Sequence, residues 1–235
     1  DYEAVMPLCW RKKWGIAYLY QPAFFQQGGI YFTKELSVST LQSFINMAFS
    51  HFKFAEITFN YLNDLAALPG YAPQMRNNYV LALSKPYNEI ASAYPGSISK
   101  NLKRVKNFNL QYQVTDDYPA ILKLYEKLYT QRINSFSKED YHNLHSNCTK
   151  LSTENNLICR QVMSNNNQLL AALILLKDNN RLYNIISCVT NEGRNAEANY
   201  FMYDKLIQEF CNSTYILDFE GSDVKGIAEF YSRFM

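Results

Sequence analysis

The chain has 235 residues, of which 48% are hydrophobic and 19% are charged. This composition is that of a globular protein with room for one large domain or two small ones, and it excludes a disordered chain. The formal net charge of +2 gives no strong reason to expect DNA or a membrane surface as a partner. The longest apolar run, residues 169–176, is too short to span a bilayer, so we expect no membrane span.

The five cysteines are odd in number and show no C-x-x-C spacing. They indicate reduced, mostly buried thiols in a cytoplasmic protein rather than a disulfide framework. His142 and His145 are three residues apart on an expected helix, without a Cys or carboxylate at ligand spacing, so we expect no metal site. The chain begins at Asp1 inside a strand pattern and ends at Met235 directly after a helical one, which leaves room for a longer natural chain at either end.

The first half of the chain has an irregular pattern. Its expected elements are strands at 3–9 and 16–20 joined through WRKKWG, a helix at 38–52, strands at 55–61 and 79–83, a helical region at 86–107 and a strand at 109–114. Proline cannot supply a helical N–H, so the helical region breaks at Pro95 and Gly96. Its second part carries the dense basic cluster at 100–106, which is either a solvated helix face or a contact for donor phosphates.

The second half is more regular. Asp117 and Pro119 indicate a helix start, and Ser137 with Asp140 resembles a capping box. The expected elements are helices from Asp117 to about 133 and from Ser137 onward, strands at 157–163, 169–176 and 182–189, a loop at 190–195, a helix at 196–212, a strand at 215–220 and a final helix. This order is ααβββαβα, and the ββ–αβ order early in the chain is a weak hint of duplication.

The ααβββαβα order of residues 115–235 is similar to the core of the GNAT acyltransferase superfamily. Three phrases, at 20–32, 81–114 and 217–234, resemble those of its Fem-type branch, in an uncharacterised bacterial form. The resemblance implies an α/β (α+β) fold of two GNAT-like lobes, whose mixed, mostly antiparallel sheets are flanked by helices. We place the lobes at 1–112, expected to be incomplete, and at 113–235.

The resemblance also implies a function. Fem-type proteins transfer amino acids from aminoacyl-tRNA to peptidoglycan precursors, and GNAT relatives transfer acyl groups from coenzyme A to amines. We therefore expect a transferase (an N-acyltransferase or aminoacyltransferase) that uses acyl-CoA or aminoacyl-tRNA as donor. Its acceptor would be a small-molecule or peptide amine.

The expected donor site departs from the GNAT pattern. GNAT proteins usually carry Q/R-x-x-G-x-G/A, whose backbone N–H groups meet a pyrophosphate at a helix N-terminus. Here the stretch NEGRNAEAN (191–199) has one glycine, and Glu192 and Glu197 oppose an anion. The residues that the resemblance assigns to the donor are Gly193, Arg194, Asn195, Asn199, Lys103 and Arg104.

Two carboxylates are the expected catalytic groups. Asp218 and Glu220 are two residues apart on an expected strand, so they share a face. The resemblance makes this strand the fifth of its lobe, beside a gap where the fourth and fifth strands separate. Either carboxylate is then a general base or a holder of a cationic amine. The alternatives are ion pairs, with Arg194, Lys225 or Arg233, or capping of the final helix, for which Ser222 and Asp223 are also suited.

Tyr203 is either the general acid that GNAT relatives often carry near this helix or a core tyrosine. The aromatic stretch that begins at residue 20 is either an acceptor pocket or a polar loop over a core, and its candidate residues are Tyr20, Gln21, Gln26 and Gln27. The incomplete glycine pattern leaves a second hypothesis open, a non-catalytic binding module for a peptide or cell-envelope precursor. A third is an RNA-binding protein that uses the basic cluster and exposed aromatic residues.

Overall fold

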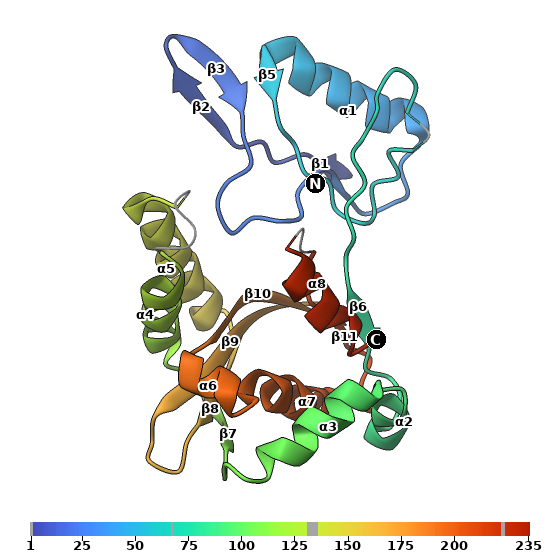
Figure 1. Ribbon diagram of the computed structural model, residues 1–235. Helices are drawn as coiled ribbons and strands as arrows, with labels where there is room; N and C mark the ends of the chain where they lie inside the picture. Colours follow the sequence, from blue (N-terminus) through green and yellow to red (C-terminus); the bar gives the residue numbers. More distant parts are fainter. Residues whose placement is uncertain (1, 67, 131–135, 222–223) are drawn as a thin grey trace. The chain divides into compact units, whose positions relative to one another are not determined.

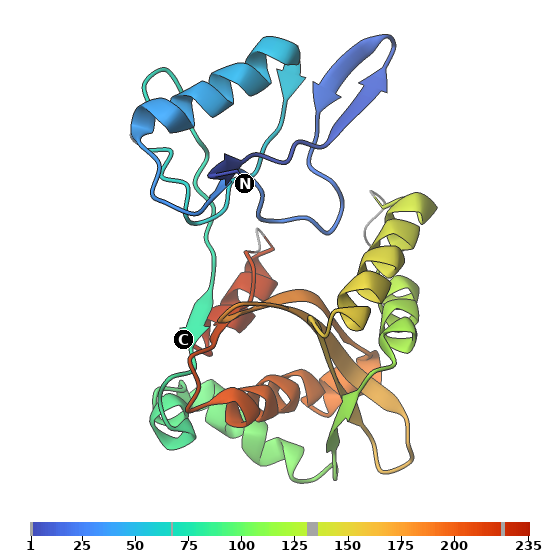
Figure 2. The same cartoon turned by 180° about the vertical axis from the view of Figure 1, so that it is seen from behind.

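The computed structural model describes residues 2–66, 68–130, 136–221 and 224–235. The chain divides into two compact units, Asp1–Met75 and Arg76–Met235, which are drawn in Figures 1 and 2. The division expected between residues 112 and 113 falls inside the second unit, within strand β7 (Gln111–Thr115). Strands from both sides of that position pair in one sheet, which explains why the chain does not divide there. That the first unit is a GNAT-like lobe remains a prediction.

The first unit contains one long helix and short strands. Its elements are β1 (Ala4–Val5), β2 (Trp10–Lys13), β3 (Ile16–Leu19), β4 (Tyr31–Phe32), α1 (Val38–His51) and β5 (Phe54–Ala55). Strand β1 pairs with β4, and β2, β3 and β5 form a three-stranded sheet with β3 in the centre. The Ser37 side chain caps α1 by accepting a hydrogen bond from the Thr40 N–H. The buried face of α1 packs on a small apolar core that includes Ile30 and Leu68.

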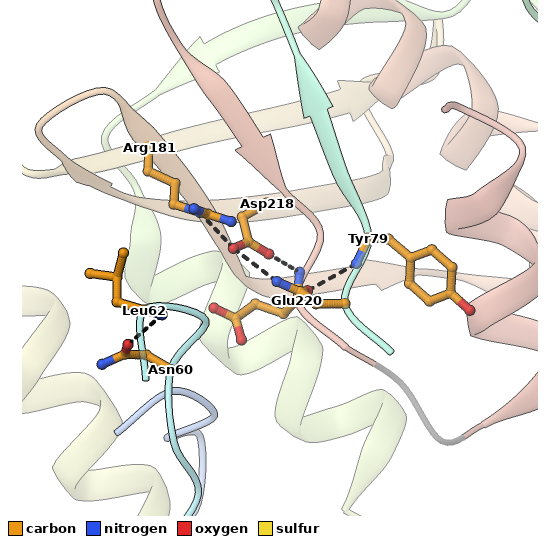
Figure 3. Close-up of polar contacts among 7 residues, drawn as sticks. Asn60, Leu62, Tyr79, Arg181, Asp218 and Glu220 are labelled. Carbon is orange, nitrogen blue, oxygen red and sulfur yellow. Dashed lines mark hydrogen bonds and ion pairs between the residues drawn. The ribbon is translucent and has the colours of Figure 1, made fainter. Parts of the chain in front are cut away.

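Three expectations for this unit were wrong. The strand expected at 3–9 is reduced to β1, and residues 6–9 lie outside any strand. The stretch WRKKWG is not a plain connection, because its first four residues form β2 and Trp14–Gly15 form the turn of a hairpin. The strand expected at 55–61 is reduced to β5, since the chain then makes turns held by buried asparagines. Asn60 donates to the Gly28 carbonyl and accepts from the Leu62 N–H at 2.9 Å (Figure 3).

The second unit is a six-stranded sheet with helices around it. Its elements are β6 (Val80–Ala82), α2 (Tyr87–Ser92), α3 (Gly96–Val105), β7, α4 (Tyr118–Tyr129), α5 (Lys138–Thr153), β8 (Leu157–Met163), β9 (Leu169–Asp178), β10 (Arg181–Val189), α6 (Asn191–Asn195), α7 (Ala198–Phe210), β11 (Ile216–Asp218) and α8 (Lys225–Ser232). The strand order is β6-β11-β10-β9-β8-β7. Among the described residues of this sheet, β10 and β11 pair in parallel and the other neighbouring strands pair antiparallel.

The apolar run of β9 forms the centre of this unit. Its residues 170–175 are all buried, because α4 and α5 cover one face of the sheet while α3, α6 and α7 cover the other (Figures 1 and 2). The predicted caps of α4 and α5 are confirmed, at Asp117 and at the Ser137–Asp140 capping box. The end predicted for the first of these helices, near residue 133, lies outside the described residues.

Candidate functional site

Strands β10 and β11 separate shortly after they begin to pair. The parallel register joins Arg181, Leu182 and Tyr183 to Ile216, Leu217 and Asp218 and then stops. At the same place the pairing of β10 with β9 shifts register between Asn184 and Ile186, which marks a β-bulge. Strand β11 ends at Asp218 while β10 continues to Val189, so the later part of β10 has no partner from β11. The separation expected beside residues 218–220 is therefore present in the fold.

Asp218 lies at this point in a buried ion pair. Its side chain has no exposed surface, and its Oδ2 accepts from the Arg181 Nε at 2.8 Å and from the Asn78 Nδ2 at 3.2 Å. A carboxylate whose oxygens already accept from a guanidinium and an amide is poorly placed to contact a substrate amine. The ion-pair alternative therefore describes Asp218, with Arg181 as partner in place of the three cations expected.

Glu220 has a different geometry from the one expected. It lies past the end of β11, and its φ of 60° is in the left-handed region, so strand alternation does not place it on the face of Asp218. Its N–H donates to the Asp218 Oδ1 at 2.8 Å, which fixes this turn (Figure 3). The Glu220 residue is 5% exposed. A non-glycine residue held in this conformation with a buried carboxylate is a marker of functional sites.

A buried amide joins two phenols beside this turn. The Asn184 Nδ2 donates to the Tyr203 hydroxyl at 2.9 Å and to the Tyr231 hydroxyl at 3.1 Å. The Asn184 Oδ1 is buried and has no hydrogen-bond partner among the described residues. Burial raises the pKa of Tyr203, and it also raises the pKa of Tyr231, with a smaller contribution from the negative charge of Glu220. Both phenols therefore keep their protons.

The separation between the strands is filled by aromatic rings, in contrast to the open polar gap that we expected. The Phe219 ring centroid lies 5.0 Å from that of Tyr231 and 5.4 Å from that of Tyr203. Phe230 and Phe234 also pack on Tyr203. The hydrophobic effect stabilises this packing, because it removes the apolar side chains of α7 and α8 from water. A substrate can reach Glu220 from this direction only if α8 moves.

Two residues of this group were missed from the sequence, Asn184 and Tyr231. Asn184 could have been identified from the sequence, because it is a polar residue in the middle of the strand expected at 182–189. Tyr231 had none, because it occupies an apolar position of the final helix. The alternative caps Ser222 and Asp223 lie outside the described residues.

The expected donor loop is a short helix, α6. Thr190 caps it, and its Oγ1 already accepts from the Gly193 N–H at 2.9 Å, so this N–H is not directed at a ligand. A Cβ on Gly193 would stand 2.3 Å from the Leu170 carbonyl oxygen, so this glycine allows α6 to pack on β9. Arg194 and Asn195 are exposed on α6, and Asn199 lies in the first turn of α7.

The basic helix does reach the start of α7. Arg104 of α3 forms an ion pair with Glu197 at 2.6 Å, and Glu197 is the N-cap residue of α7. The Glu197 side chain makes no capping hydrogen bond to α7, so its carboxylate is engaged by Arg104 instead. Lys103 is exposed one residue before Arg104. The packing of α3 on α7 thus brings Arg104 to the start of α7, where Asn199 lies, but among the described residues no side-chain hydrogen bond or ion pair joins two of the expected donor residues.

Two of the four expected acceptor residues share a pocket in the first unit. Tyr20 and Gln21 line it, together with residues that include Cys9, Phe25 and Glu56. The Arg11 guanidinium lies 4.2 Å from the centre of the Tyr20 ring. Gln26 and Gln27 do not line this pocket, and the Gln27 carbonyl instead accepts from the Tyr31 hydroxyl at 2.9 Å.

The described residues hold no cluster of three or more His, Cys, Asp or Glu side chains that could bind a metal ion. All five cysteines are free thiols, and Cys148, Cys159 and Cys188 are buried. Within the described part of the chain, no helix has the length and apolar character needed to cross a membrane.

Comparison with known proteins places the fold. No family model matches the chain, and no curated protein matches it. Among solved structures, it is similar to FemX, with a TM-score of 0.67, 11% identity and coverage of 100% of this chain and 82% of that one. It is also similar to the C-terminal domain of a protein described as a lysylphosphatidylglycerol synthetase from Agrobacterium fabrum, with a TM-score of 0.62, 10% identity and coverage of 99% and 77%.

A third similar structure is a conserved protein of unknown function from Bacteroides thetaiotaomicron, with a TM-score of 0.51 and 12% identity. The match covers 72% of this chain, which spans only 60% of that one. At these identities the likeness shows the fold alone. The predicted α/β class is confirmed, and it is shared with FemX and with the lysylphosphatidylglycerol synthetase domain.

Proposed function

We propose that the protein is an acyltransferase that moves an aminoacyl or acyl group from aminoacyl-tRNA or acyl-CoA to an amine. The observation that carries the proposal is the buried Glu220 where the pairing of β10 with β11 ends, next in sequence to Phe219, whose ring packs on the buried phenols of Tyr203 and Tyr231. The likeness to FemX and to a domain whose name describes the joining of lysine to phosphatidylglycerol supports this reaction class. So does the Fem-type resemblance of three sequence phrases.

The chemistry assigned to each group follows from its protonation state. An attacking ammonium must lose a proton, and we assign that step to the buried Glu220 carboxylate rather than to Asp218, which is in an ion pair with Arg181. The amine nitrogen then bonds to the acyl carbon, and the bond from that carbon to the donor's leaving atom breaks. Tyr203 and Tyr231 keep their protons and can donate hydrogen bonds to the oxyanion or supply a proton to the leaving atom. Asn184 orients both phenols.

Access to these groups requires a displacement of α8. Such a movement must break the packing of Phe230 and Tyr231 on Tyr203 and the hydrogen bond from Asn184 to the Tyr231 hydroxyl. Binding of the acceptor would replace the packing of Phe230 and Tyr231 on Tyr203.

The donor would be held near the start of α7, where its phosphates would compete with Glu197 for Arg104. Glu197→Gln removes the competing charge and should raise affinity for the donor. Arg104→Gln should lower that affinity. Equal effects of the two variants would contradict this placement.

The test is a screen of acyl-CoA species and aminoacyl-tRNAs with amine acceptors, followed by product detection and by thermal shift. Turnover with any donor supports the proposal. The absence of both turnover and thermal shift with every donor class would count against it.

The aromatic packing favours a second candidate, a non-catalytic module that binds a peptide or cell-envelope precursor. Aromatic rings fill the separation between β10 and β11, and Arg104 is already paired with Glu197. Both observations are expected of a protein that has the transferase fold but does not catalyse a reaction. The two candidates are distinguished by ligand binding without turnover in the parent protein, which only the module predicts.

A further inference from the structure

The hairpin of β2 and β3 exposes an unusual set of side chains, which we call the basic–aromatic hairpin: Trp10, Arg11, Lys12, Lys13, Trp14 and Ile16, with Phe54 of the neighbouring strand β5. All four residues of β2 are exposed, and the hairpin extends from the rest of the first unit (Figure 1). Trp10 is 58% exposed, Trp14 is 89% exposed and Phe54 is 61% exposed.

The cations alone have an ordinary explanation. Strand β2 is an edge strand of its sheet, and lysines on an edge prevent pairing with another chain. That explanation does not account for the tryptophans, since an exposed indole at an edge promotes association. Trp14 is the sharper case, because it occupies the turn with a φ of 52°, a conformation that bulky residues rarely adopt and that asparagine or glycine would fill without strain.

The charges along the sequence of the hairpin have one sign. From residue 4 to residue 34 the chain carries Arg11, Lys12, Lys13 and Lys34 and no Asp or Glu. Among the described residues, no carboxylate lies within ion-pair distance of Lys12 or Lys13. The Lys13 ammonium lies 4.7 Å from the centre of the Trp14 ring, so cation and indole form one unit at the turn.

We propose that the basic–aromatic hairpin docks on the surface of an anionic lipid bilayer. Indole rings partition to the boundary between lipid headgroups and acyl chains, and adjacent lysines and arginines are attracted to anionic headgroups. A protruding turn with both residue types fits that boundary without any membrane-spanning segment. RNA is the other polyanion that exposed cations and rings can bind. The bilayer is favoured because the most exposed indole lies at the outermost turn, where it can insert, rather than within a groove that follows a strand of nucleic acid.

The protein contains its own reporter for this docking. Trp10 and Trp14 are the only tryptophans in the chain, so all indole fluorescence comes from the hairpin. With vesicles of phosphatidylcholine and phosphatidylserine, we expect a blue shift of the emission and protection from acrylamide. With phosphatidylcholine alone, we expect much weaker effects. Added salt should reverse the binding, because surface charges are screened within about 10 Å at 0.1 M ionic strength.

Charge-matched variants make the test specific. Lys12→Gln with Lys13→Gln should weaken vesicle binding about 30-fold, or about fivefold for each charge removed. The same two changes at Lys138 and Lys150 on α5, which are also exposed, should leave binding unchanged. Trp14→Ala should weaken binding while circular dichroism stays that of the parent. The proposal is overturned if anionic vesicles leave the emission unchanged, if single-stranded RNA shifts it while vesicles do not, or if both lysine pairs have equal effects. Transferase activity enters none of these readouts, so the proposed function can fail independently.

Discussion

Removal of Arg181 should strongly destabilise the second unit. Asp218 has no exposed side-chain surface and its partner's side chain is 9% exposed, so Arg181→Met leaves a buried carboxylate without its counter-charge. Breaking a buried ion pair from one side costs about 3–5 kcal/mol. Asn78 and the Glu220 N–H still donate to the carboxylate, which argues for the lower end, about 3 kcal/mol.

Urea denaturation followed by far-ultraviolet circular dichroism measures this change. With a denaturant slope of about 2 kcal/mol per molar urea, the midpoint should fall by about 1.5 M. Lys34→Met is the matched control, because the Lys34–Glu3 pair has a similar length, 3.1 Å, but side chains that are 79% and 78% exposed. That variant should lose less than about 1 kcal/mol.

The double variant Arg181→Met with Asp218→Leu should be more stable than Arg181→Met alone, since it removes both buried charges together. Our reasoning is refuted if Arg181→Met shifts the midpoint no more than Lys34→Met does. It is also refuted if the stability losses of the single variants Arg181→Met and Asp218→Leu add up to the loss of the double variant, because residues in direct contact should show a coupling energy.

Three further predictions concern packing, acid stability and thiol reactivity. Gly193→Ala should cost about 1–3 kcal/mol of unfolding free energy, whereas Gly96→Ala, with no atom within 4 Å of the added methyl group, should be nearly neutral in the same thermal melts. Burial raises the pKa of Glu209, but the hydrogen bonds and charge of Arg160 outweigh burial and hold the pKa below the ordinary 4.5. The ionised Glu209 therefore stabilises the fold above pH 4.5, and this stabilisation is lost as the pH falls through the lower pKa of the folded state. Arg160→Met should remove this contribution from the acid-unfolding curve. Ellman's reagent should react with the native protein at no more than two thiols, and unfolding should release three more, at Cys148, Cys159 and Cys188, because burial raises their pKa values to about 11, 12 and 12.

The second unit could largely be predicted from the sequence, because its elements have strong local signals. Strand β8 has the predicted bounds, and the Ser137–Asp140 capping box fixes the start of α5. These features depend on nearby residues, since periodicity and caps act within a few positions. The first unit has short strands that exist only through distant pairing, so the hairpin of β2 was taken for a connection.

The candidate site could be predicted only in part, for a similar reason. Glu220 was predicted from its place in the sequence and its role stays a prediction. Its left-handed backbone and its separation from the face of Asp218 depend on a turn fixed by the hydrogen bond between the two residues. The partner of Asp218 was missed because Arg181 lies 37 positions away and reaches it through the parallel pairing of β10 with β11. Pairing between distant strands carries no signature in either segment alone.

The most direct measurement of the central claim compares single-turnover transfer rates of the Glu220→Gln and Asp218→Asn variants at equal folded concentration. If Glu220 is the base, its variant should keep parental stability and transfer about 10²- to 10⁴-fold more slowly. The Asp218 variant should lose stability but retain most of its rate when folded. Equal rates for the parent protein and Glu220→Gln would contradict the account.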